Sequence, residues 1–418
     1  MKRILIALIV FALAPSTSFA GPKIEVLHWW TSGGEAAALK VLKDDFAANG
    51  GEWLDMPVTG GGGDAANVTL KARIVAGDPP SASQIKGPTI QEYDQEGVIA
   101  PYNIDAVAQA EGWDNLLDPM IAAVHKCQNN SGPYCAAPVN IHRIDWIWAN
   151  KVVFDEHGLS MPTTWDELNA AADTLKAAGI IPFAHGGQPW QDATVFEAVA
   201  MGVGGNNYYK NCFVKLQENC LRSETTVAVF NQMRKLANYT DPGSPGRDWN
   251  VATGMVIEGK AGFQIMGDWA KGEFTAAGKA AGWDYLCGST PSNNGYLYNV
   301  DSFVFYQTSD PDKVAGQKLL AKLMMGKNFQ KVFNLYKGSI PARLDVPMDE
   351  FDDCAKKSNA DIKTSGASGG LLPSFAHGMA QGNTIKSALQ DVITEHFNSD
   401  MSSVDAANAL ADTVLANM

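Results

Sequence analysis

Strand-like and helix-like segments alternate in the first part of the chain, and this alternation most limits the possible folds. Residues 23–30, 52–58 and 83–85 have the composition of β-strands. Residues 35–49 and 64–76, which lie between them, place apolar side chains at helical spacing. A β-α-β-α-β order predicts a mainly parallel sheet covered by helices, which is an α/β fold.

A second α/β pattern begins near the middle of the chain. Residues 145–149 form an apolar, tryptophan-rich segment typical of a buried strand, and residues 261–266 and 299–305 are predicted as further strands. Thr164 and Glu167 have the spacing of a capping box that starts a helix. We therefore predict two α/β lobes that are joined by several crossings of the chain and not by one flexible linker.

The chain begins with a segment typical of a secretory signal. Lys2 and Arg3 precede an apolar run over residues 4–15, and small residues, Ser18 and Ala20, follow at the −3 and −1 positions. We expect a signal peptide over residues 1–20, cleaved near Ala20, and export to the periplasm. An N-terminal membrane anchor is the alternative, but the run is too short to span a bilayer.

Acidic residues outnumber basic residues in the exported part. Without Lys2 and Arg3, 45 Asp and Glu face 30 Lys and Arg, a net charge of −15. A protein with this charge is repelled by nucleic acids and by anionic membranes. We therefore expect no nucleic-acid partner and no membrane-surface partner.

All six cysteines lie in the exported part. An even number of cysteines in an oxidising compartment indicates disulfides. In two pairs, the cysteines lie eight positions apart with turn-forming residues between them. The remaining two cysteines would then form a long-range disulfide. The sequence contains no Cys-x-x-Cys spacing, so it does not indicate that the cysteines form a metal site. We predict three disulfides: Cys127–Cys135, Cys212–Cys220 and Cys287–Cys354.

The sequence offers little support for catalysis. It contains no His-Glu-x-x-His, and residues 60–63 form a glycine run that lacks the Lys-Ser/Thr ending of a phosphate loop. No spacing singles out a glycosidase-like pair among the 45 acidic residues. We predict no catalytic residue, cofactor or metal, with a secreted carbohydrate-active enzyme as the alternative.

Tryptophans suggest a different kind of site. Trp29 and Trp30 end the first predicted strand, at the edge where open α/β sheets bind ligands. Since adjacent strand residues point to opposite faces, we expect at most one of the two in the core. An indole plane covers the apolar face of a sugar, and charged groups bond its hydroxyls. The 11 tryptophans of the chain therefore favour a carbohydrate cleft.

Several segments, in order, resemble family 1 extracellular solute-binding proteins, the binding components of bacterial ABC sugar transporters. They are residues 23–30 with Glu35, 71–80, 93–101, 138–150, 162–168 and 258–269. The resemblance implies a two-lobed periplasmic-binding-protein fold in which each lobe is a sheet flanked by helices. It also implies a ligand in the cleft between the lobes, hinge closure without catalysis, a monomer, and membrane permease subunits as partners.

The family order also implies domain boundaries. We expect residues 21–140 and 300–343 in the N-terminal lobe, and residues 141–299 and 344–418 in the C-terminal lobe. The crossings between lobes are expected near residues 138–145, 297–303 and 340–346.

A narrower resemblance is to the glucose- and mannose-binding members of the family. It implies that one of Trp29 and Trp30, with Trp249 or Trp269, stacks on a hexose ring. It also implies that charged residues bond the hydroxyls. These are Glu35, Lys86, Asp301, Lys337 and His377. The expected ligand is glucose or mannose. A binding protein for an oligosaccharide or a polyol phosphate is the alternative, although acids in the same cleft disfavour a phosphate.

Overall fold

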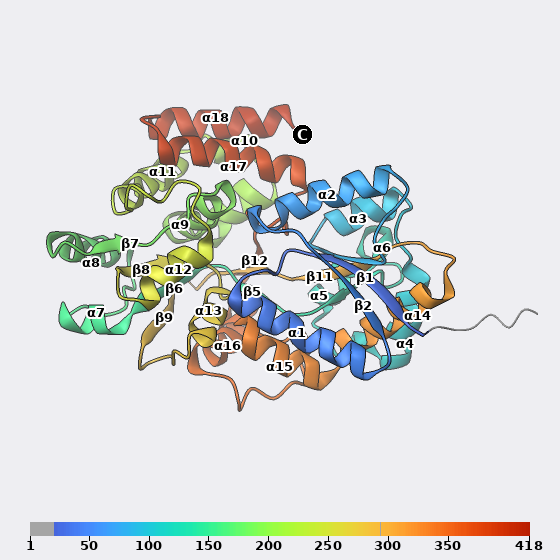
Figure 1. Ribbon diagram of the computed structural model, residues 1–418. Coiled ribbons are helices and arrows are strands. Elements are labelled where there is room, and N and C mark those ends of the chain that lie inside the picture. The colour runs from blue at the N-terminus through green and yellow to red at the C-terminus, as the bar shows by residue number, and fades with distance from the viewer. Residues whose placement is uncertain (1–20, 293) are drawn as a thin grey trace, which may run out of the picture.

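The structure, a computed structural model, describes residues 21–292 and 294–418. The predicted signal peptide, residues 1–20, lies outside the described residues. Figure 1 shows two lobes side by side, with the N-terminal strands in one and the middle of the chain in the other. Each lobe is a β-sheet covered by helices, which confirms the predicted two-lobed α/β fold.

The first lobe is built on a mixed five-stranded sheet. In spatial order its strands are β2 (Glu52–Pro57), β1 (Lys23–His28), β3 (Ala82–Ile85), β11 (Ser302–Phe305) and β4 (Ala136–Pro138). β1 runs parallel to β2 and β3, and β11 runs antiparallel to β3 and β4. Its helices are α1 (Gly33–Ala48), α2 (Asp64–Val75), α3 (Thr89–Gln95), α4 (Pro101–Glu111), α5 (Pro119–Val124), α6 (Cys127–Asn130), α14 (Pro311–Met324) and α15 (Lys327–Lys337).

The second lobe is built on a four-stranded sheet. In spatial order its strands are β7 (Ile181–Phe183), β8 (Ala261–Ile265), β6 (Trp146–Asn150) and β9 (Tyr285–Ser289). Every residue of β6 and β8 is buried, because helices cover both faces. These helices are α7 (Lys151–Glu156), α8 (Trp165–Ala177), α9 (Pro189–Tyr209), α10 (Glu218–Leu221), α11 (Glu224–Ala237), α12 (Trp249–Ile257), α13 (Ala270–Ala276), α17 (Asn383–Asn398) and α18 (Ser403–Ala416).

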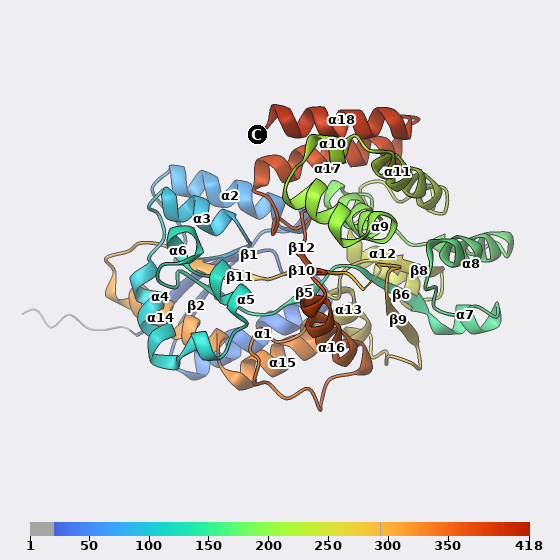
Figure 2. The ribbon, with the colours of Figure 1, turned by 180° about the vertical axis from the view of Figure 1, so that it is seen from behind.

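A three-stranded sheet lies between the lobes (Figure 2), with β10 (Tyr296–Asn299) flanked by β12 (Leu371–Pro373) and β5 (His142–Arg143). The chain passes from β4 through β5 to β6, and returns from β9 through β10 to β11. It leaves the first lobe again after α15 and reaches α17 through α16 (Asp353–Ala367) and β12. Each crossing therefore contributes one strand to this sheet.

Local sequence explains where several helices begin. The Thr164 hydroxyl accepts the Glu167 N–H at 3.1 Å, and the Glu167 carboxylate accepts the Thr164 N–H at 3.2 Å. This confirms the predicted capping box of α8. α1 begins with a similar box, because the Glu35 carboxylate accepts the Ser32 N–H at 3.5 Å. Glu35 is thereby held at the start of its helix, beside the end of β1.

The structure corrects the prediction of one strand over residues 299–305. β10 ends at Asn299 and β11 begins at Ser302, and the two strands belong to different sheets. At the break, the Asp301 N–H donates to the Asn140 side chain at 3.0 Å, and the Asp301 carbonyl accepts the Val139 N–H at 2.9 Å. The apolar pattern continues through the break because both strands are buried.

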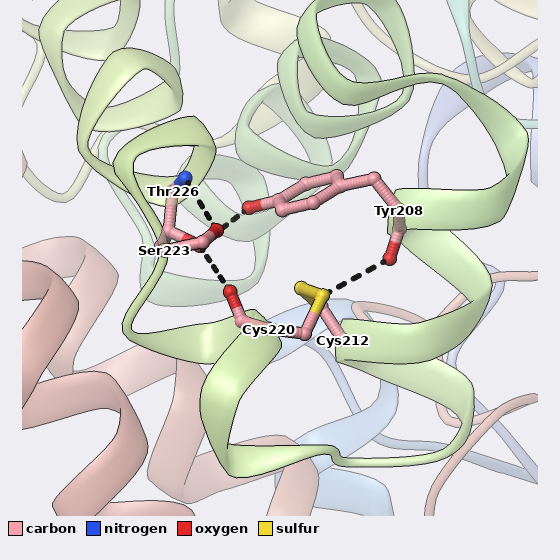
Figure 3. Close-up of a disulfide and its surroundings, with 5 residues drawn as sticks. All are labelled: Tyr208, Cys212, Cys220, Ser223 and Thr226. Carbon is pink, nitrogen blue, oxygen red and sulfur yellow. Dashed lines mark hydrogen bonds between the residues drawn. A yellow bond between two sulfur atoms is a disulfide. The ribbon is translucent and has the colours of Figure 1, made fainter.

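The three predicted disulfides are confirmed: Cys127–Cys135, Cys212–Cys220 and Cys287–Cys354. Figure 3 shows the second of them, which lies between the segment that continues α9 and the short helix α10. Beside it, the hydroxyls of Tyr208 and Thr226 are 2.8 Å apart, and the Thr226 hydroxyl donates to the Cys220 carbonyl at 3.0 Å. The C-terminal end of α9 is therefore fixed to the start of α11.

Candidate functional site

A polar cleft of about 240 Å³ lies between the lobes. The first lobe contributes residues that follow β1, β2 and β3, at the carboxyl ends of its parallel strands. The second lobe and the crossings contribute the opposite side. The lining residues are Trp29, Thr31, Ser32, Glu35, Thr59, Gly60, Gly62, Gly63, Lys86, His142, Gln188, Trp190, Asp248, Trp249, Asn250, Trp269, Asn299, Asp301, Lys337 and His377.

A buried ion pair lies at one end of the cleft. The Lys337 ammonium donates to the Glu35 carboxylate at 2.9 Å, and both side chains are almost fully buried. The other Glu35 oxygen accepts the N–H groups of Thr31 and Ser32 at the start of α1. The backbone and the ion pair together fix the direction of both charged groups before a ligand binds.

His142, in strand β5 of the three-stranded sheet, links two carboxylates. Its Nδ1 bonds Asp268, which follows β8, and its Nε2 lies 2.9 Å from an oxygen of Asp301. Burial alone would lower the pKa of His142, but the charges of Asp268 and Asp301 outweigh it and raise this pKa. Burial would raise the pKa of Asp301, but His142, Lys337 and Lys86 lower it. The two carboxylates therefore favour the charged form of the imidazole, and Asp301 is ionised.

Lys86 is the unpaired cation of the cleft. Among the described residues, its ammonium has no hydrogen-bond or ion-pair partner, and it lies 5.0 Å from the centre of the Trp29 ring. Burial lowers the pKa of Lys86 to about 8, although Asp301 acts to raise it. An ammonium in this state has donors to offer to a ligand.

Aromatic rings form the side of the cleft that the second lobe contributes. Trp190 and Trp269 are almost fully buried and lie 6.3 Å apart between ring centres. His377 meets Trp269 edge-on at 4.9 Å. The glycine run fits against these rings, because a Cβ at Gly62 would lie 2.9 Å from Trp190. The run is therefore a close-packed wall of the cleft, and its positive φ angles also favour glycine.

His377 has a defined tautomer. The Thr194 hydroxyl donates to the Trp190 carbonyl at 2.7 Å and lies 2.9 Å from His377 Nε2. Because the hydroxyl has only one hydrogen, Nε2 must carry the ring proton and donate it to Thr194. Burial and the charge of Lys86 lower the pKa of His377 well below its usual value. The ring is neutral, and Nδ1 remains a hydrogen-bond acceptor.

The structure brings eight of the nine predicted site residues together around this cleft: Trp29, Glu35, Lys86, Trp249, Trp269, Asp301, Lys337 and His377. Trp30 is the exception, so of the two alternatives Trp29 lines the cleft and Trp30 does not. Its side chain is 1% exposed and packs against Phe303 and Phe333 in the core of the first lobe. β1 ends at His28, and the next two residues point in opposite directions, with Trp29 toward the cleft.

Sequence reasoning missed several lining residues, among them His142, Gln188, Trp190, Asp248 and Asn299. His142 lies in the crossing segment 138–150, which the family resemblance did mark. Trp190 follows a Gly-Gly-Gln-Pro turn, a signal that could have placed it at a strand-to-helix edge. Asn299 is two residues before Asp301 and was assigned to a continuous strand.

The lobes contact each other on both sides of the cleft. Lys386 on α17 pairs with Asp64 on α2 at 2.5 Å. On the other side, the Glu273 carboxylate of α13 accepts the Gly34 N–H of α1 at 2.8 Å. Carboxylates near the first N–H groups of a helix are favourable, so Glu273 is a second, inter-lobe cap of α1. The two contacts therefore connect the lobes on opposite sides of the cleft.

Within residues 21–292 and 294–418, no cluster of His, Cys, Asp or Glu side chains could hold a metal ion. In the same part of the chain, none of the helices has the length and apolar character that a membrane span requires.

Solved structures share this fold at low sequence identity. A chitin oligosaccharide binding protein superimposes with a TM-score of 0.78 at 18% identity, covering 95% of this chain and 99% of that one. The bacterial solute receptor AcbH, described with a preference for β-D-galactopyranose, gives a TM-score of 0.77 at 17% identity over 95% and 99% of the two chains. These similarities confirm the two-lobed fold.

Sequence comparison places the chain more narrowly. A "Probable sugar-binding periplasmic protein" of Brucella suis biovar 1 (strain 1330) is 48% identical over 394 residues, which are 94% of this chain and 92% of the relative. The family model of bacterial extracellular solute-binding proteins matches residues 30–324. The chain belongs to the bacterial extracellular solute-binding protein family.

Proposed function

We propose that the chain is the periplasmic sugar-binding receptor of an ABC transporter and that its ligand is one hexose, glucose or mannose. The two-sided cleft carries this proposal, because oriented charged groups of one lobe lie opposite aromatic rings of the other. Pyranose rings have apolar C–H faces and polar edges, so they need both kinds of group. The close relative in Brucella suis, which is named as sugar-binding and periplasmic, supports the same role.

The size of the cleft favours a single ring. Its volume of about 240 Å³ is below the range of roughly 300–1,000 Å³ that is usual for drug-sized ligands. In the proposed complex, Trp29, Trp249 and Trp269 contact the ring faces. The hydroxyls are bonded by the charged groups of Glu35, Lys86, Asp301 and Lys337 and by the neutral ring of His377. We add His142, Trp190 and Asn299 to the site.

Closure of the lobes gives the proposed mechanism. We propose lobes of residues 21–140 with 300–343, and of residues 141–299 with 344–418, hinged at the three-stranded sheet. A sugar bonded from both lobes stabilises the closed state, because only that state makes both sets of contacts. The permease subunits then recognise the closed monomer. The sugar leaves unchanged, so the protein has no enzymatic role.

The charge state of the cleft disfavours the enzyme alternative. A glycosidase needs a protonated carboxylic acid beside the bond it cleaves. Burial acts to raise the pKa of Asp301, but His142, Lys337 and Lys86 lower it. The carboxylate of Glu35 is paired with Lys337. Neither carboxyl is suited to donate a proton.

Calorimetric titration with glucose, mannose, galactose and a disaccharide tests the proposal. We expect tight binding of glucose or mannose and a change in tryptophan emission. A sugar at 100 times its Kd would also raise the free energy of unfolding by about 2.7 kcal/mol. Tighter binding of the disaccharide would favour the second candidate, an oligosaccharide receptor like the chitin oligosaccharide binding protein of the same fold. Binding of no sugar would contradict both.

A further inference from the structure

Glu197 on α9 is a fully buried acid behind the aromatic side of the cleft. One carboxylate oxygen accepts the Ser374 hydroxyl at 2.6 Å. The other accepts the Tyr209 hydroxyl at 2.9 Å and the N–H groups of Phe375 and Ala376 at 3.0 and 3.3 Å. No basic side chain of the described residues pairs with this carboxylate, so these donors alone stabilise it.

Three of these donors belong to the segment that contains His377. This segment, Ser374 to Gly378, follows β12 and has no regular structure. The Ser374 hydroxyl also accepts the His377 N–H at 3.0 Å. On its other side the segment meets the first lobe, since a Cβ at Gly87 would lie 2.2 Å from the Gly378 carbonyl oxygen. An irregular segment in such a confined place needs a fixed anchor.

α9 supplies that anchor on the helix face that also forms the cleft. Trp190, Thr194 and Glu197 are separated by four and three residues, so they lie on one face of the helix. Trp190 lines the cleft, Thr194 sets the tautomer of His377, and Glu197 holds the backbone before His377. The Ser374 N–H donates to the Tyr298 carbonyl of β10 at 3.0 Å, and the Phe375 N–H also lies 3.1 Å from the Tyr209 hydroxyl. Among the described residues, the Ala376 N–H has the Glu197 carboxylate as its acceptor.

We infer that Glu197 is a positioning residue for sugar binding, which holds Ser374, Phe375 and Ala376 so that the ring of His377 stays in the cleft. Glu197 does not line the cleft, so it would act on a bound sugar only through the segment that it holds. Burial raises the pKa of Glu197 to about 7, and its hydrogen bonds act to lower it. A glutamine would keep the arrangement, because its carbonyl accepts the backbone N–H groups and its amide donates to Ser374. The inference rests on the proposed function only where it concerns the sugar.

Binding measurements test this role through the conservative variant. We expect E197A to weaken binding of glucose or mannose about 10- to 100-fold, the factor for one lost hydrogen bond to a charged or strongly polar group. S374A, a smaller change, should weaken binding in the same direction, and E197Q should stay within about threefold of the wild type. D192A is the matched control, because Asp192 is equally buried on α9 but bonds His185 and Thr394 instead. Wild-type affinity in E197A would overturn the inference.

Hydrogen exchange of the sugar-free protein tests the anchor by itself. We expect the amides of Phe375 and Ala376 to exchange at least about tenfold faster in E197A than in the wild type, and at the wild-type rate in E197Q and D192A. Amides of α8 should keep their protection in all variants, which shows that the lobe remains folded. Unchanged exchange of residues 374–378 in E197A would overturn the inference, even if the wild type bound no sugar and the proposed function failed.

Discussion

The two sides of the cleft are positioned by different interactions. On the side of the first lobe, ion pairs and helix-start N–H groups orient charged side chains, as they do for Glu35 and Lys337. On the side of the second lobe, His377 packs edge-on against Trp190 and Trp269, whose rings are tilted relative to each other. The comparison indicates that both sides are ordered before a ligand arrives, which reduces the entropy lost on binding. It also predicts that the two sides respond differently to mutation.

Removal of Asp301 should have the largest effect. D301A would leave the charged His142 without one partner and Lys86 without its nearby counter-charge. We expect the free energy of unfolding to fall by about 3–5 kcal/mol, the usual cost of breaking a buried ion pair. Urea denaturation measures this change. The exposed Asp349 provides the control, since D349A should change stability by no more than about 0.5 kcal/mol.

Lys337 tests whether the charged side bonds the sugar directly. K337A should weaken sugar binding by roughly 1.5–3 kcal/mol, the range for hydrogen bonds to charged groups. Lys331, on the same helix, pairs with Glu350 at the surface and lies outside the cleft, so K331A should bind as the wild type does. Calorimetry compares the two variants. Equal affinities would mean that Lys337 only supports Glu35.

Trp269 tests the aromatic side in the same way. W269A should weaken binding by roughly 1.5–3 kcal/mol, which is about the gain from burying one large apolar side chain. W283A is the control, because Trp283 is 83% exposed and lies outside the cleft. W269A should also lose most of the emission change on sugar addition, whereas W283A should keep it. A full emission change in W269A would place the sugar against other rings.

The smallest expected effect is a pH dependence from His142. Its pKa in the folded protein is raised, so its stabilisation is fully present below the unfolded value of about 6.5 and is lost as the pH rises through the folded pKa. Unfolding free energies from pH 5 to about pH 9 should therefore show the gap between wild type and H142Q narrowing as the pH rises. H157Q, at the C-cap of α7, is the control. A gap that widens with pH would contradict a charged His142.

Much of the fold follows from short-range patterns. Apolar periodicity predicted β1, α1, β2, α2 and β3 in order, because each pattern reports the burial of one strand or helix face. The capping box of α8 and the two short disulfides were also predictable, because their partners are close in the sequence. The cleft residues were predicted mainly from the family resemblance, because charged residues at a binding site have no local sequence pattern that distinguishes them from other charged residues.

Only the tertiary structure decided which groups act together. The sequence pattern could not choose between Trp29 and Trp30, because that choice depends on where β1 stops being paired. It could not break the strand at Asp301, because both halves are buried in different sheets. Asp268 and Asp301 lie 126 and 159 residues from His142, and residues 374–376 lie 177 to 179 residues from Glu197. Only packing brings these groups within hydrogen-bond distance. Local sequence therefore determined the elements, and long-range contacts determined the site.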